Sequence, residues 1–181
     1  MERRNIFTQQ GLDYQKARLR KFKEAAREAG NRAGAEAGMN CDWHDNPAYD
    51  EAKADLEKYS RRAKDLESEM SGANVVEVLE QDVRVRVGNT VGYLDIETDD
   101  EKQVTIGAWG ESDANMGLVS YTSPLAKALI GAEEGDERVM RVEGKGKSTK
   151  LEVLEIFPPS YKYHELIQRL LASIDDNGSE E

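Results

Sequence analysis

The chain has 181 residues, of which 34% are charged and 38% hydrophobic, and its 25 basic and 36 acidic side chains give a net charge of −11. No apolar run approaches the ~20 residues that a membrane-spanning helix needs, and the N-terminal segment has no apolar signal core, which predicts a soluble, unsecreted, cytoplasmic protein. The single cysteine excludes a disulfide framework and a thiolate metal site, and with only two histidines most polar chemistry falls to aspartate and glutamate.

The charge is divided unevenly along the chain. Residues 1–72 contain 14 Lys/Arg and 14 Asp/Glu, whereas residues 73–181 contain 11 and 22 and therefore carry the whole net charge. The first part is rich in Ala, Arg, Lys and Glu, and the β-branched residues crowd into the second. We therefore predict a helical arm over 1–72, a compact β domain over 73–157, and a C-terminal helix with an acidic tail over 158–181.

A heptad pattern dominates the first part. From Tyr49 to Met70 the apolar residues are spaced alternately by three and four, and a weaker version of the same pattern runs from Leu12 to Ala33. Such a seam is typical of a coiled coil, so two helices, 9–38 and 47–71, are predicted to pack antiparallel. At ~1.5 Å per residue, this arm extends about 40 Å.

The turn between these helices contains two carboxylates. Gly38 can end the first helix, and Asn46 with Pro47 is a typical helix start. Asp42 and Asp45 lie three residues apart in the turn, a spacing that allows both to converge on one hard cation such as Mg²⁺. The alternative is that the two acids only favour the positive end of the second helix, and spacing alone leaves both readings open.

Basic residues are concentrated in the first helix, where residues 14–32 include Arg18, Arg20, Lys21 and Arg27. A positive stripe on an otherwise neutral arm suits contact with nucleic-acid phosphate. A solvated helix face with intrahelical ion pairs is the equally weighted alternative.

The second part consists of short runs with partial alternation and one helix. The helix is marked by Ser123 as its cap, Pro124 at its first position and Gly131 after its end. The predicted strands are 75–79, 83–87, 90–96, 103–107, 118–122, 138–143 and 150–157. A small antiparallel sheet wrapped on one helix is the simplest arrangement. A further helix over 161–174 is expected, without a predicted position, followed by a disordered tail.

Two segments resemble the bacterial Gre transcript-cleavage factors. The tip matches the family pattern G-D-x-x-E-N-A-E-Y at Asp42, Asn46 and Tyr49, with Asp45 where Glu is usual. The second segment, 88–136, is similar to the C-terminal Gre domain and includes the run GLVSYTSPLAKALIG. The resemblance covers roughly 10–157.

This resemblance implies an α+β protein with an N-terminal antiparallel two-helix coiled coil and a C-terminal FKBP-like antiparallel β domain with one short helix. It implies an accessory factor, not itself an enzyme, that binds RNA polymerase at the secondary channel and stimulates the polymerase's cleavage of the 3′ end of backtracked RNA. Mg²⁺ would be shared with the polymerase and held only in the complex. The implied roles are metal handling for Asp42 and Asp45, tip shaping for Asn46 and Tyr49, polymerase binding for Asp113, Ser123 and Pro124, and RNA contact for Arg18, Arg20, Lys21 and Arg27.

The tip also departs from the family pattern. Asp45 is one methylene shorter than Glu, and Cys41, Trp43 and Pro47 alter the surroundings of the acids. A Gre-like factor that enters the channel and inhibits, without stimulating cleavage, is therefore the alternative. An FKBP-like prolyl isomerase or chaperone with a helical arm is a third hypothesis. The protein is expected to be a monomer.

Overall fold

The computed structural model describes residues 5–39, 46–80, 83–141 and 148–176, with side chains described as far as 172. The chain forms two compact units. Among the described residues, one unit comprises Asn5 and 12–73 and is called the arm; the other comprises 6–11 and 74–176 and is called the sheet unit. The second unit therefore includes a short N-terminal segment that the predicted boundary at residue 72 assigned to the arm.

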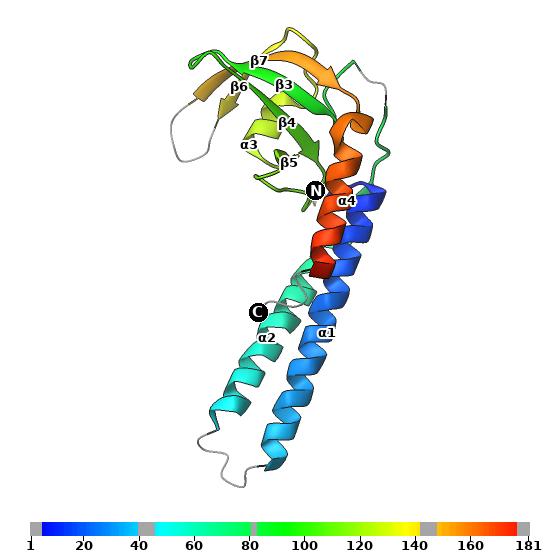
Figure 1. Ribbon diagram of the computed structural model, residues 1–181, viewed down its shortest axis with the longest axis vertical. Helices are drawn as coiled ribbons and strands as arrows, with labels where there is room; N and C mark the ends of the chain where they lie inside the picture. The colour runs from blue at the N-terminus through cyan, green and yellow to red at the C-terminus, as the bar shows by residue number, and fades with distance from the viewer. Residues whose placement is uncertain (1–4, 40–45, 81–82, 142–147, 177–181) are drawn as a thin grey trace. The chain divides into compact units, whose positions relative to one another are not determined.

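The arm consists of two long antiparallel helices, α1 (Gln9–Met39) and α2 (Pro47–Met70), which run side by side in Figure 1. Ion pairs between the helices show the antiparallel register: Lys23 Nζ lies 2.5 Å from Glu67 Oε1, and Arg32 Nη2 lies 2.8 Å from Asp55 Oδ2. The predicted bounds differ from the observed ones by a single residue at the C-terminal end of each helix. The two-helix part of the fold prediction is confirmed.

The predicted seam is the buried face of α2. Ala52, Ala63 and Leu66 are buried, with exposed fractions of 2%, 7% and 6%, and the other seam residues are half-buried. On α1, Ala29 and Ala33 are buried. Because most of these buried side chains are methyl groups, the arm removes little apolar surface from water.

The sheet unit contains a five-stranded sheet in the order β5-β4-β3-β7-β6 and a two-residue parallel pair, β1-β2. The strands are β1 (Ile6–Phe7), β2 (Asn74–Val75), β3 (Thr90–Asp95), β4 (Asp100–Gly107), β5 (Leu118–Ser120), β6 (Glu137–Arg141) and β7 (Ser148–Phe157). All pairs in the larger sheet are antiparallel except β4–β5, which is parallel. The α+β class is confirmed, and this parallel pair is the one departure from the antiparallel sheet predicted.

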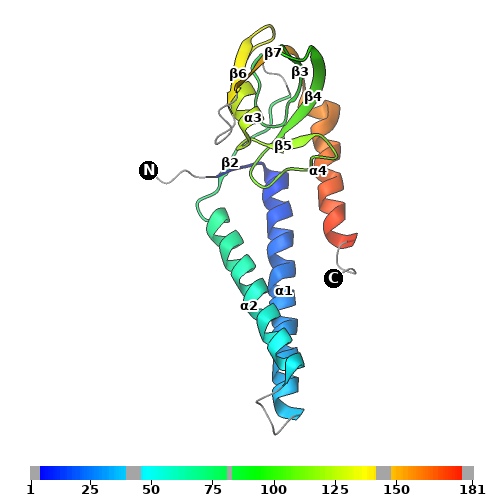
Figure 2. The same ribbon diagram turned by 90° about the vertical axis from the view of Figure 1, so that its left-hand side faces the viewer.

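The core lies between the sheet and α3 (Pro124–Leu129), which packs against one face of the sheet in Figures 1 and 2. Ser123 caps α3, because its Oγ accepts a hydrogen bond of 3.1 Å from the Ala126 amide, and Pro124 occupies the first turn. Gly131 follows the helix with φ of 81°, a conformation that favours glycine. The predicted helix, its cap and its end are all confirmed.

Two predicted strands are wrong. Only Val75 of the segment 75–79 is in a strand, and no described residue of 83–87 is in one. The alternation around Val85 arises because this residue is fully buried against the loop after α3, where its amide donates to the Ala132 carbonyl at 2.9 Å. A β-strand requires a series of backbone hydrogen bonds to a neighbouring strand, whereas this segment pairs with the loop after α3 at Val85 alone.

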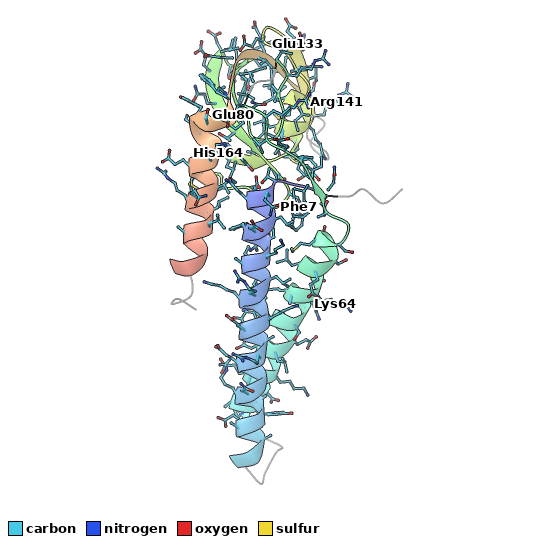
Figure 3. The ribbon with its side chains drawn as sticks, turned by 90° about the vertical axis from the view of Figure 1, so that its right-hand side faces the viewer. Phe7, Lys64, Glu80, Glu133, Arg141 and His164 are labelled. Atoms are coloured by element: carbon cyan, nitrogen blue, oxygen red, sulfur yellow. The ribbon has the colours of Figure 1, made fainter. Side chains whose placement is uncertain are left out.

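The C-terminal helix α4 (Pro159–Asp176) belongs to the sheet unit. Its Tyr163, Leu166, Ile167 and Leu170 are all buried. His164 Nε2 lies 3.0 Å from Glu80 Oε1, and Figure 3 shows the two side chains next to each other. This hydrogen bond is the main cause that lowers the pKa of the Glu80 carboxyl.

Candidate functional site

The end of the arm is fixed by Asn46. Its Oδ1 accepts a hydrogen bond of 3.2 Å from the Tyr49 amide, and Pro47 occupies the first turn of α2. Its Nδ2 lies 3.4 Å from the Glu36 carbonyl oxygen of α1, so this one side chain bridges both helices. At 8% exposure, Asn46 is buried at the point where the tip meets the arm.

The predicted acidic pair lies outside the described residues. Asp42 and Asp45, together with Cys41, Trp43 and His44, fall within the turn 40–45. The structure describes the two ends of that turn, Met39 and Asn46. Asp45 therefore directly precedes the residue that caps α2.

Tyr49 lies one turn into α2, where it is half-buried. The ammonium group of Lys53 is 5.9 Å from the centroid of the Tyr49 ring, which is within the range of a cation–π contact. Asn46 and Tyr49 are thus linked through the capping hydrogen bond. This geometry is compatible with the tip-shaping role that the resemblance implies, which stays a prediction.

The four predicted RNA-contacting residues lie on two faces of α1. Arg20 and Arg27, seven residues apart, share a face and are exposed. Arg18 is half-buried, its guanidinium 5.7 Å from the Tyr14 ring centroid and donating to Gln15 Oε1 at 3.1 Å.

The basic residues of α1 also differ in their ion pairs. Lys16 pairs with Asp13 and Lys23 with Glu67. Within the described part of the chain, Arg20 and Arg27 take part in no ion pair, which leaves them as free cations on the arm.

Asp113 shapes the loop that precedes β5. Its backbone forms an isolated bridge with Leu118, with both hydrogen bonds at 2.9 Å. Its carboxylate oxygen Oδ1 accepts hydrogen bonds from the amides of Asn115 at 2.8 Å and Met116 at 3.3 Å. The loop closes at Gly117, where φ is 67°.

Ser123 and Pro124 stand at the other end of β5. The Ser123 hydroxyl is engaged as the cap of α3, whereas Pro124 is exposed. Asp113 and Ser123 therefore flank the same short strand, the edge of the larger sheet. The fold brings the three residues predicted to bind the polymerase to one part of the sheet unit.

A shallow hollow of about 250 Å³ lies on the sheet around Gly92, between β4 and β7. Phe157 is the one aromatic residue in its lining, and charged or amide side chains such as Glu101, Lys102 and Gln103 form much of the rest. This hollow is not the aromatic-lined pocket expected of a prolyl isomerase.

Comparisons with known proteins agree with the two-part organisation. The family described as "Transcription elongation factor, N-terminal" matches residues 5–75, and "Transcription elongation factor, GreA/GreB, C-term" matches residues 80–158. The chain is 35% identical over 144 residues to "Transcription elongation factor GreA" of Jannaschia sp., which covers 80% of this chain and 92% of that protein. The chain belongs to the GreA/GreB family of transcription elongation factors.

A second relative and one solved structure are also similar to the chain. "Transcription elongation factor GreA" of Nitratiruptor sp. is 36% identical over 170 residues, covering 91% of this chain and 100% of its own. A solved "GreA factor homolog 1 (Gfh1)" of Thermus thermophilus aligns with 85% of this chain and 99% of its own at 23% identity, with a TM-score of 0.40.

The Gre family descriptions end at residue 158, so α4 lies beyond both of them. Residues 161–174 were predicted as helical, but periodicity gave no indication of where the helix packs. In the structure, Tyr163 of α4 reaches a buried cluster that also contains Thr8 and Glu111. Sequence reasoning missed this cluster, because its members are 52 to 155 residues apart in the chain.

No helix among the described residues of this Gre-family chain is both long and apolar enough to cross a membrane. Nor do three or more His, Cys, Asp or Glu side chains gather into a potential metal site in the ranges that the structure describes.

Proposed function

We propose that this Gre-family factor binds RNA polymerase, places its arm in the secondary channel, and stimulates the polymerase's own cleavage of backtracked RNA. The observation that carries the proposal is the family membership, with relatives named GreA that align over nearly their whole length. In this proposal the chain is an accessory factor, and the catalytic centre belongs to the polymerase.

The reactive end of the factor is the pair Asp42 and Asp45. Carboxylate oxygens are the ligands that Mg²⁺ prefers, but two of them hold the ion weakly, so further ligands must come from the polymerase and the RNA. When bound, Mg²⁺ lowers the pKa of a water molecule and stabilises the leaving oxygen of the phosphodiester. The role of this chain is to deliver and orient the two carboxylates.

The arm supports such delivery. Asn46, the residue after Asp45, is bonded to both α1 and α2 at the base of the tip. A misplacement of the reacting groups by ~1 Å can cost about a hundredfold in rate. The main contribution of the described residues is therefore the Asn46 cap, which fixes the point where the tip joins the arm.

The sheet unit would provide the docking surface. Pro124 is exposed at the start of α3, and Asp113 holds the loop at the other end of β5. We propose that this edge of the sheet, around β5, contacts the rim of the secondary channel. Arg20 and Arg27, the two unpaired cations on one face of α1, are the preferred candidates for contact with the extruded RNA, ahead of Arg18 and Lys21.

The test is RNA cleavage by a halted, backtracked transcription complex. The double variant Asp42→Asn, Asp45→Asn should lose stimulation by about a hundredfold or more while still competing for the polymerase. Asp50→Asn is the matched control, because Asp50 is an exposed acid in the first turn of α2 and should not reach the metal. Equal stimulation by the wild type and the double variant would exclude the carboxylate mechanism.

The shorter side chain of Asp45 and the bulky residue Trp43 in the same turn of the sequence favour one alternative, a factor that occupies the channel and inhibits. Tight binding to the halted complex without acceleration of cleavage by the wild type would select this alternative. The same assay therefore separates the two functions.

A further inference from the structure

A carboxylate is fully buried in the sheet unit without a cation. Glu111, in the loop after β4, has no exposed surface, and no ion pair within the described residues involves it. Its Oε1 lies 2.8 Å from Thr8 Oγ1, and its Oε2 lies 2.8 Å from Tyr163 Oη. Tyr163 Oη also lies 2.9 Å from Thr8 Oγ1. The three side chains thus form a closed ring of oxygen contacts.

The number of protons in this ring can be counted. Each of the three separations is that of an O–H···O hydrogen bond, which needs one proton between its oxygens. The hydroxyls of Thr8 and Tyr163 supply one proton each, and an ionised carboxylate supplies none. Two protons leave one oxygen pair in contact with no hydrogen between them, whereas a protonated Glu111 fills all three positions.

The remaining contacts agree with this count. The Gly11 amide donates to Thr8 Oγ1 at 3.0 Å, and the Ala108 amide donates to Glu111 Oε2 at 2.8 Å. With the third proton on Oε2, Glu111 donates to Tyr163, Tyr163 donates to Thr8, and Thr8 donates to Glu111 Oε1, in agreement with the donor directions of the last two contacts. This arrangement leaves every oxygen of the ring and both amides with a hydrogen-bond partner.

The surroundings favour the neutral carboxyl. Burial raises the pKa of Glu111, and its hydrogen bonds with Ala108, Tyr163 and Thr8 only partly offset that effect. Burial and the adjacent carboxyl likewise raise the pKa of Tyr163, the other titratable group in the ring. His164 follows Tyr163 on α4, but its Nε2 bonds Glu80. The amide end of α1 favours the anion, yet it contributes only a fraction of the cost of an unpaired buried charge.

The ring joins three distant parts of the chain. Thr8 immediately precedes α1, Glu111 follows β4, and Tyr163 belongs to α4. The fit around the first turn of α1 is tight, because a Cβ at Gly11 would lie 1.8 Å from Glu111 Oε1. Within the sheet unit, the ring therefore joins the first turn of α1 and helix α4 to the loop after β4.

We propose that Glu111 keeps its proton in the folded protein at pH values where the unfolded chain has lost it, and that its closed ring with Thr8 and Tyr163 fixes α4 and the first turn of α1 in place. Tyr163 is then a positioning residue for the first turn of α1, supplied by a helix outside both family descriptions. The inference does not depend on the proposed function.

The first test compares unfolding of the full chain as a function of pH for the wild type and Glu111→Gln. Gln is the nearest replacement that does not titrate: its amide nitrogen can donate to Thr8, and its oxygen can accept from Ala108 and Tyr163. A raised folded pKa means that the folded protein binds the extra proton, so stability is full below the unfolded pKa of about 4.3 and falls as pH rises toward the folded pKa.

In that interval, the unfolding equilibrium constant of the wild type should therefore increase relative to Glu111→Gln by about tenfold per pH unit. Glu137→Gln, an exposed acid of β6, is the control and should show no such relative change. A wild type that gains stability over Glu111→Gln as pH rises, or a difference that stays constant, would overturn the protonated ring.

The second test uses Tyr163→Phe, which removes the hydroxyl group and keeps the aromatic side chain. Amides of α4 and the Gly11 amide should exchange with solvent about tenfold faster, because one buried hydrogen-bonded link is lost. Tyr161→Phe is the matched control, since Tyr161 lies on the same helix at 47% exposure and stacks on Phe157. Exchange in Tyr163→Phe no faster than in Tyr161→Phe would contradict the fastening role.

Discussion

The two units of this Gre-family factor are stabilised in different ways. The arm buries mostly alanines along one seam, and its cross-helix ion pairs are largely exposed. The sheet unit has a true core, with Val85, Val91 and Ile106 fully buried, and a buried polar ring beside it. In the proposed function the arm needs length and a rigid end, whereas the sheet unit must fix a docking surface and the start of α1.

The largest effect is expected in the core of the sheet unit. Ile106→Ala removes a fully buried branched side chain from β4 and should lower the free energy of unfolding by about 3–4 kcal/mol. Amide exchange measured on the intact chain should accelerate in the sheet unit first. Equal acceleration throughout the arm would show that the two units unfold as one.

Two glycines of α1 offer a sharper comparison, because one lies in each unit. Gly11→Ala places a methyl group against Glu111 Oε1 and should cost about 2–3 kcal/mol. Gly34→Ala meets nothing within 4 Å and should stabilise the chain by about 0.5–1 kcal/mol through helix propensity. Thermal unfolding should show a lower melting temperature for Gly11→Ala and a higher one for Gly34→Ala. A shift of both melting temperatures in the same direction would contradict the surroundings assigned to the two glycines.

A smaller loss is expected at the end of the arm. Asn46→Ala removes the cap of α2 and the bond to the Glu36 carbonyl, and should cost about 1–2 kcal/mol. Amide exchange should accelerate in the first turn of α2 and leave α3 unchanged. Ser123→Ala, the equivalent change at α3, should reverse that pattern.

The smallest effect is expected for a surface ion pair of the arm. Arg61 pairs with Glu57 at 2.9 Å, with 71% and 74% of the two side chains exposed. Arg61→Ala should change the free energy of unfolding by less than about 0.5 kcal/mol. A loss above 1 kcal/mol in a urea titration would mean that charge pairs contribute more to the arm than its seam does.

Local patterns of the sequence predicted much of this architecture. The three-four spacing from Tyr49 to Met70 identified α2 and its buried face, and the Ser123-Pro124 pair with Gly131 located α3. Both signals depend only on neighbouring residues. β4 begins three residues before the prediction, because Asp99 turns the chain in the left-handed region at a φ of 57°, which composition did not indicate.

Non-local features could not be predicted in the same way. Gln15 interrupts the apolar seam of α1 and is nevertheless fully buried, with its Oε1 bonded to Arg18. In the sequence, nothing distinguishes Glu111 from an ordinary acidic residue of a loop. Only the fold shows that it is buried, because it brings Thr8 and Tyr163 next to Glu111. At the candidate site the identities of Asp42 and Asp45 come from the resemblance, while the Asn46 cap is supported by both sequence and structure.

The most direct test of the central claim is the Mg²⁺ dependence of RNA cleavage in a backtracked complex saturated with the factor. If Asp42 and Asp45 complete a cation site, the wild type should lower the Mg²⁺ concentration needed for half-maximal cleavage. The Asp42→Asn, Asp45→Asn variant should return it to the value without factor. A Mg²⁺ dependence that is the same with the wild type, with the variant and without factor would contradict the account.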